Sequence, residues 1–165
     1  MKPLIRGLVV AALHAALVLA IGAKVLTDRA TLPRAWARAV PGPGPRFEGR
    51  YARLRIVLDG MPTDSAALRR AGNRARLEAR EGRLVGHPAV SQGELRVATT
   101  AVDETALTTL AEPVTYFVPE GAPDPFARLP GEELWVEVTV PGRGSPRPIQ
   151  LGLRRDSEIM PLGRP

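Results

Sequence analysis

The sequence predicts a mainly β protein: a small antiparallel β-sandwich or partly open barrel, preceded by one N-terminal transmembrane helix. Three observations support this fold class. The chain begins with a long apolar run between basic residues, and later its apolar residues recur at every second position. Pro/Gly turns separate these short alternating segments, and no helical period is sustained after the apolar run. The 165 residues therefore divide into an anchor, 1–27, a Pro/Gly-rich linker, 28–46, an extracytoplasmic β-domain, 47–154, and a polar C-terminal tail, 155–165.

The first segment predicts a membrane anchor. Gly7 to Ala23 carries no fixed charge and lies between Arg6 and Lys24. Basic side chains can extend toward the headgroups, so residues 4–25 are expected to cross the lipid bilayer, which needs about 20 apolar residues. A cleaved signal peptide is the alternative, because Ala20 ends a tolerable cleavage site. The apolar run is, however, longer than the roughly 7–15 residues usual in signal peptides.

The orientation of the chain rests on two opposed signals. A short basic N-terminus before a first apolar segment behaves as a signal that exports the rest of the chain, so we expect the β-domain to lie outside the cytoplasm. Arg29, Arg34 and Arg38 come after the span and favour the opposite orientation by the positive-inside rule. His14 lies in the middle of the span, where a tolerated neutral imidazole competes with a functional ionisable group.

Residues 28–46 are predicted to be a linker. Pro33 interrupts a weak helical pattern, and PGPGP at 41–45 suits neither a helix nor an inner strand, since proline lacks the backbone donor. An extended spacer of polyproline character would lift the domain off the membrane. Trp36 is expected either at the bilayer interface, where tryptophan is enriched, or over part of the core.

The β-domain opens with a strictly alternating strand, Tyr51–Leu58. Its two faces carry Ala52, Leu54, Ile56 and Leu58 on one side and Tyr51, Arg53, Arg55 and Val57 on the other. Asp64 or Ser65 then caps a short helix that Gly72 closes. A hairpin around Glu81-Gly82 and strands over 94–102, 113–118, 133–140 and 148–153 complete the expected elements.

The residue inventory excludes several kinds of chemistry, and we predict no cofactor and no metal. The chain has no cysteine, which rules out thiolate nucleophiles, disulfides and cysteine zinc sites. Lys2 and Lys24 both flank the apolar run, so a Ser/Lys dyad in the domain is implausible. His87 is the only histidine outside the span, and a triad built from it with a serine such as Ser91 lacks the nucleophile-elbow pattern.

Acidic residues and net charge bear on two broader classes of function. Paired carboxylates remain formally possible, because several acidic residues lie close together in sequence: Glu120, Asp124, Glu132 and Glu133. Nucleic acid is not an expected partner, since the net charge of +6 comes from scattered arginines and aromatic residues are few.

Two stretches stand out, GRYARLRI at 49–56 and YFVPEG at 116–121. Together they resemble the GDYXXLXY family of bacterial membrane-anchored proteins of uncharacterised function, over residues of about 40–153. In that family a GDY-x-x-L-x-Y strand follows an apolar segment, and a YFVPEG-like segment comes later. Here Arg50 stands where the family has Asp and Ile56 where it has the final Tyr. The resemblance implies a bacterial cytoplasmic membrane location and a multi-spanning membrane protein as partner.

The two stretches supply the candidate functional residues. A surface for a partner or ligand is predicted to contain Gly49, Arg50, Tyr51, Arg53, Arg55, Tyr116 and Glu120, with Leu54, Phe117, Pro119 and Gly121 as structural motif residues. We expect a non-enzymatic envelope protein that acts as an accessory or interaction subunit. A membrane-tethered hydrolase or peptidase-like β-domain, or a binding module for an anionic envelope ligand through Arg50, Arg53 and Arg55, are the alternatives.

Overall fold

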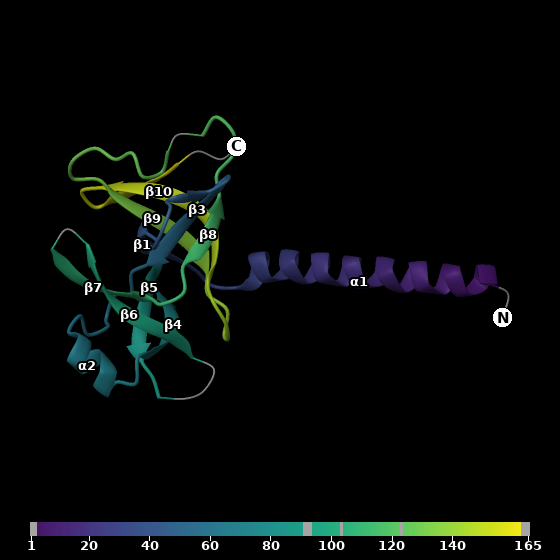
Figure 1. Ribbon diagram of the computed structural model, residues 1–165, viewed down its shortest axis with the longest axis horizontal. Helices are drawn as coiled ribbons and strands as arrows, with labels where there is room; N and C mark the ends of the chain where they lie inside the picture. Colours follow the sequence, from purple (N-terminus) through teal and green to yellow (C-terminus); the bar gives the residue numbers. More distant parts are fainter. Residues whose placement is uncertain (1–2, 91–93, 103, 123, 163–165) are drawn as a thin grey trace. The chain divides into compact units, whose positions relative to one another are not determined.

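The computed structural model describes residues 3–90, 94–102, 104–122 and 124–162, and it contains two compact units, residues 1–32 and 33–165. The first unit is helix α1, Pro3–Thr31 (Figure 1). Within it, the 21-residue stretch Gly7–Thr27 is long and apolar enough to cross a membrane, with a mean hydropathy of 2.2 in its most apolar window. The Nδ1 atom of His14 lies 2.9 Å from the backbone oxygen of Val10, so one ring nitrogen has a hydrogen-bond partner within its own helix.

The second unit is mainly β, as predicted. Its strands are β1 Arg34–Pro41, β2 Phe47–Glu48, β3 Tyr51–Ile56, β4 Arg74–Arg80, β5 Arg83–Pro88, β6 Leu95–Val102, β7 Thr105–Leu110, β8 Val114–Phe117, β9 Glu133–Thr139, β10 Arg147–Arg155 and β11 Glu158–Pro161. The short helix α2, Ser65–Arg70, begins where Asp64 accepts hydrogen bonds from the backbone of Ala66 and Ala67. The predicted cap and the predicted hairpin at Glu81-Gly82 are therefore confirmed.

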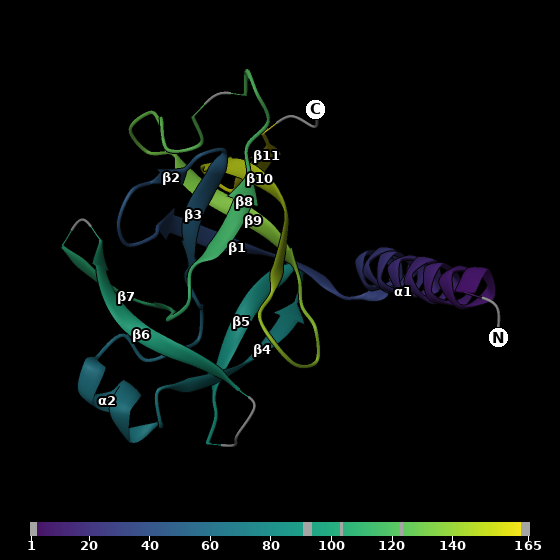
Figure 2. The same ribbon diagram turned by 45° about the vertical axis from the view of Figure 1, so that its right-hand side comes forward.

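The strands form one open sheet that is not closed into a barrel. Its main path runs β11-β10-β9-β1-β5-β4-β6-β7, while β3 pairs with β1 and carries β2 and β8. Nearly all pairings are antiparallel, and β1 meets β5 in parallel at Trp36 and Arg83. Figure 2 shows β3 and β8 side by side and β6 and β7 curving away as a separate arm. A bridge between Val57 and Thr109 joins that arm to the end of β3.

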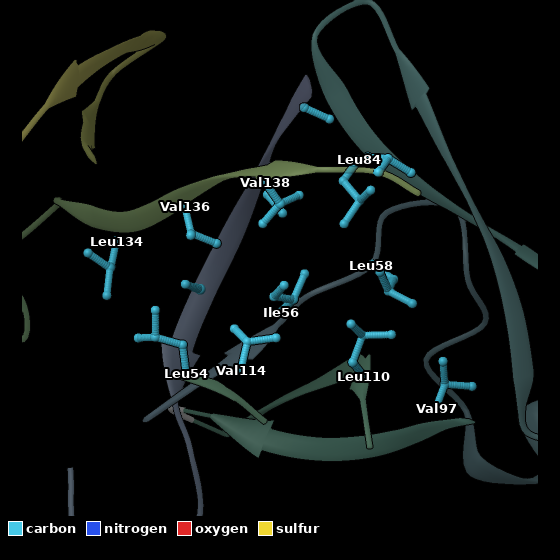
Figure 3. Packing of buried hydrophobic residues seen from close by; sticks show 14 of the residues in the cluster. Leu54, Ile56, Leu58, Leu84, Val97, Leu110, Val114, Leu134, Val136 and Val138 are labelled. Carbon is cyan, nitrogen blue, oxygen red and sulfur yellow. The ribbon is translucent and has the colours of Figure 1, made fainter. Parts of the chain in front are cut away.

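The hydrophobic core lies between β9 and β1 on one side and β3, β7 and β8 on the other. Figure 3 shows the side chains of β9 pointing toward those of β3 and β8, and the facing rows are Leu134, Val136 and Val138 against Leu54, Ile56 and Val114. All of these side chains are buried. The apolar residues predicted to share a face in 51–58 and in 133–140 therefore lie in this core, and β9 also buries Trp135 and Thr139 on its other face.

The predicted linker is wrong over most of its length. Helix α1 continues to Thr31, and residues 34–41 form β1, which lies in the sheet between β9 and β5. Its alanines, Ala35, Ala37 and Ala39, face the core, and their small side chains gave a weak strand signal in the sequence. The PGPGP stretch is a turn of the domain, because Gly42 donates a hydrogen bond to the backbone oxygen of Arg53 at 2.8 Å.

Two further strands were not expected, and the structure also places Trp36. Residues 158–161 of the predicted polar tail form strand β11, which pairs with β10. Strand β7 was not predicted, since its threonines obscure the apolar alternation. Trp36 lies within β1 and packs over Gly152 of β10, where a Cβ atom would meet its ring at 3.0 Å.

Candidate functional site: the outer face of β3 and β8

Strands β3 and β8 bring the two sequence motifs together. They pair antiparallel, with Tyr51 opposite Phe117 and Arg53 opposite Thr115. Because side chains alternate along a strand, these four residues share the outer face. Ala52 and Leu54 of β3, together with Val114 and Tyr116 of β8, are on the other face, toward the core. Two segments more than sixty residues apart in the sequence thus form one surface.

The centre of this surface is an exposed aromatic pair. The rings of Tyr51 and Phe117 meet edge to face, with centroids 5.6 Å apart and an angle of 63° between the planes. Tyr51 is 50% exposed and Phe117 49% exposed. Contact between the rings removes only part of their apolar area from water, so the surface retains a strong tendency to be covered. Phe117, which we predicted to be structural, is therefore a principal residue of this surface.

An ion pair connects the turn before β3 to the turn after β8. A guanidinium nitrogen of Arg50 lies 2.6 Å from a carboxylate oxygen of Glu120, and both side chains are largely exposed. The backbone also joins the two motifs, since the amide of Val118 donates to the oxygen of Arg50 at 2.8 Å. This contact links the first sequence motif to the second. An exposed pair of this kind contributes little stability.

Two glycines shape the turns that carry this ion pair. Gly49 and Arg50 connect β2 to β3, and Gly49 has a φ of +62°. Gly121 follows Glu120 with a φ of +78°. No atom lies within 4 Å of the place where a Cβ would stand at either glycine, so conformation rather than close packing requires them. Pro119 lies just beyond the end of β8, as expected.

Two predicted surface residues have other surroundings: Tyr116 lies on the inner face, and Arg55, although it alternates with Tyr51 and Arg53, is half-buried against β6. Tyr116 packs against the core, and burial raises the pKa of its hydroxyl. Arg55 donates a hydrogen bond to the Thr100 hydroxyl at 2.8 Å, and its buried Nε has no partner among the described residues. Arg53 lies 3.9 Å from Glu48 instead. The arginines of the first motif therefore contact separate neighbours and do not converge on one point.

The residues considered for catalysis are also dispersed. His87 lies 2.9 Å from Glu78 across β4 and β5, and both are exposed. Ser91 lies outside the described residues. Of the four carboxylates, Glu120 pairs with Arg50, Asp124 accepts from the Phe126 backbone, Glu132 pairs with Arg155 and Glu133 pairs with Arg38 and Arg154. Within the described part of the chain, no group of three or more potential metal ligands gathers.

Glu132 is poorly suited to act as a general acid. Its oxygens accept from the Leu129 amide at 2.9 Å and from Arg155 at 2.5 Å. Both contacts favour the ionised form, and they lower the pKa of Glu132. A general acid needs a raised pKa, so this carboxylate has the opposite tuning. The adjoining hollow, of about 430 Å³, is lined by further charged residues and holds no convergent apolar wall.

One cluster was not anticipated from the sequence. Trp135 is buried although it points away from the aliphatic core, and the guanidinium groups of Arg83 and Arg154 lie 4.6 Å and 5.2 Å from its ring centroid. Its indole donates to Glu133 at 3.2 Å. The alternating sequence of β9 puts Trp135 on the other face of the strand from its valines. Nothing in the sequence indicated that arginines of β5 and β10 would lie over its ring. We interpret the cluster as structural, because the indole is already covered.

No protein-family model matches the chain, and no curated protein or solved structure matches it. The resemblance to the GDYXXLXY family therefore stays a prediction, carried by the two motifs that β3 and β8 bring side by side.

Proposed function

We propose that this protein is a single-pass membrane protein of the bacterial cytoplasmic membrane and that its extracytoplasmic β-domain binds another protein. In this proposal it is a non-enzymatic accessory or interaction subunit of a multi-spanning membrane protein. The apolar helix α1 supports the membrane attachment. The exposed Tyr51–Phe117 pair is the observation that supports protein binding.

The composition of the surface favours a protein partner. Tyrosine, phenylalanine and arginine are enriched in the centres of protein interfaces, where a few aromatic side chains carry much of the binding energy. Here two half-exposed rings lie in contact, with Arg50 and Glu120 at their edge. A partner that covers the rings can also exchange hydrogen bonds with both charges of this pair. The multi-spanning nature of the partner is carried by the family resemblance alone.

The alternative functions have weaker support. A hydrolase needs a nucleophile or a tuned acid, whereas the four carboxylates considered contact separate partners and His87 contacts only Glu78 among the contacts described for it. A site for an anionic ligand at Arg50, Arg53 and Arg55 needs converging cations, and these three side chains contact different neighbours.

Photo-crosslinking in intact membranes tests the proposal. A photoreactive phenylalanine analogue at Phe117 is expected to form a discrete adduct that contains a multi-spanning membrane protein. The matched control is the same analogue at Val90, which is 90% exposed but lies between β5 and β6. A partner captured equally from both positions, or only lipid captured from Phe117, would contradict protein binding at this surface.

A second experiment tests the orientation. A reporter that is active only outside the cytoplasm, fused after Pro165, is expected to be active. Inactivity of this fusion in an intact, membrane-bound chain would reverse the orientation.

A further inference from the structure

The end of the β-domain at which the chain enters from α1 is formed by two turns and the first residues of β1. The β4–β5 turn lies there because the Trp36 amide donates to the Gly82 oxygen at 2.7 Å. The β9–β10 connection lies there because the Val140 amide donates to the Pro33 oxygen at 2.8 Å. We call this the entry end. The aromatic surface is at the opposite end of β3, whose residues 54–56 pair with 39–41 of β1.

The entry end is strongly basic. Arg80 in the β4–β5 hairpin and Arg143 in the β9–β10 connection are both exposed. Arg34 and Arg147, which begin β1 and β10, are exposed as well. Glu81 is the one acidic residue within the two segments 80–83 and 140–147. The opposite end has no such bias, because it carries as many exposed or half-exposed acids as arginines. The arginines are Arg46, Arg50 and Arg128, and the acids are Glu48, Glu120 and Asp124.

The length of the chain keeps the entry end near lipid. Thr27 ends the apolar stretch, and four more residues complete α1, a rise of about 6 Å. That distance is similar to the thickness of one headgroup layer, which is about 5–7 Å. Leu32 and Pro33 alone separate Thr31 from Arg34, a reach of at most roughly 11 Å. This bound on Arg34 follows from chain length and holds for every orientation of the domain.

We propose that the entry end, through Arg34, Arg80, Arg143 and Arg147, binds the phosphate headgroups of anionic phospholipids. This inference rests on the proposed membrane attachment of α1. Guanidinium groups suit phosphate oxygens because they donate in a planar fork. Each basic residue near an anionic leaflet strengthens binding by about fivefold. Docking of this end leaves the Tyr51–Phe117 surface, at the other end of β3, free for a protein partner.

The test uses the full chain in nanodiscs made of phosphatidylcholine alone or with about one third phosphatidylglycerol. The chain has no cysteine, so a fluorophore can be placed at one engineered cysteine. Gly142→Cys labels the entry end, where open space surrounds the new side chain. Ala122→Cys labels an exposed position beyond β8 as the control. Quenching by a lipid that carries a nitroxide on its headgroup reports proximity to the surface.

We expect quenching at position 142 to be several-fold stronger with phosphatidylglycerol, and to fall as salt rises, because salt screens exposed charges. Arg80→Glu/Arg143→Glu should shift the ratio of docked to free domain by about 25-fold or more, since two favourable residues are lost and replaced by repulsive ones. Arg80→Lys/Arg143→Lys, which keeps the charge, should retain most of the quenching. Arg46→Glu/Arg128→Glu, with the same change in net charge at the opposite end, should also retain it.

Equal quenching in both lipids, or quenching unaffected by Arg80→Glu/Arg143→Glu, would overturn the headgroup proposal. Membrane attachment is measured separately, by flotation with vesicles after alkaline extraction. A chain that floats but shows no lipid-dependent quenching overturns headgroup binding alone. A chain that does not float overturns the anchor, and headgroup binding with it.

Discussion

Tyr51 and Phe117 lie opposite each other on β3 and β8, and their rings meet edge to face with centroids 5.6 Å apart while about half of each residue stays exposed. In this arrangement, the exposed rings are available for binding, while the stability of the fold comes mainly from other residues. The backbone of both strands is fixed by pairing and by the core beneath, whereas the rings themselves add little to that core. Substitution at these positions should therefore affect binding and stability very differently.

The first prediction concerns stability. Tyr51→Ala and Phe117→Ala should each lower the free energy of unfolding by about 1 kcal/mol or less, because half-exposed rings lose little burial and one edge-to-face contact. Leu54→Ala, on the buried face of β3, should cost about 2–5 kcal/mol. Chemical denaturation of the purified full chain in detergent measures all three. Comparable losses for the rings and for Leu54 would show that the rings belong to the core.

A second prediction concerns the two motif glycines. Gly49→Ala and Gly121→Ala should each destabilise the domain by about 1–2 kcal/mol, because a residue with a Cβ is strained at positive φ. Gly142→Ala is the control, since open space surrounds its Cα and its φ is not positive. Its free energy of unfolding should match that of the wild type within about 0.5 kcal/mol. Equal effects at the three positions would remove the conformational explanation.

The third prediction tests β1 as an inner strand. Ala37 is buried between β9 and the core, so Ala37→Asp should leave a carboxylate with no partner and unfold the domain or cost at least about 3 kcal/mol. Pro43→Asp introduces the same charge at an exposed position of the following turn and should be nearly neutral. Limited proteolysis and thermal unfolding distinguish the two variants. A folded Ala37→Asp protein would restore the linker interpretation of residues 28–46.

The fourth prediction is a pH dependence at Glu132. The Leu129 amide and Arg155 lower the pKa of Glu132 in the folded state below the usual value of 4.5. Its contribution to stability is therefore complete above the unfolded pKa and is lost as the pH falls through the folded pKa. The difference in unfolding free energy between wild type and Glu132→Gln should be largest near pH 7 and shrink below about pH 4.5. A difference that is constant with pH would contradict this linkage.

The parts of the fold that could be predicted have local signals. Strand β3 alternates over its whole length, Asp64 caps α2 directly, and the two-residue turn at Glu81-Gly82 defines its hairpin. Strand β1 was missed because its buried face carries only alanines, which do not mark a strand by themselves. Strand β11 was missed because it gains its stability from pairing with β10, and its own four residues carry no clear apolar alternation.

In the candidate site, too, some features could be predicted from the sequence and others could not. The sequence indicated that Tyr51 and Arg53 share a face and that residues of both motifs form one surface, and the structure brings the two motifs together at β3 and β8. It could not indicate that Phe117 would be exposed and Tyr116 turned inward, because that depends on which edge of β3 receives β8 and in what register. The partner of Arg55, Thr100, lies on β6 and was equally out of reach of local patterns.

The central claim, that the Tyr51–Phe117 surface binds a membrane protein partner, is tested most directly by co-purification from native membranes. Tyr51→Ala/Phe117→Ala should reduce the recovered partner at least about 30-fold, as loss of an aromatic hot spot does. The matched control, Leu129→Ala/Met160→Ala, removes two other exposed apolar side chains and should leave recovery unchanged. Unchanged recovery with Tyr51→Ala/Phe117→Ala, in a chain that is folded and membrane-bound, would contradict the account.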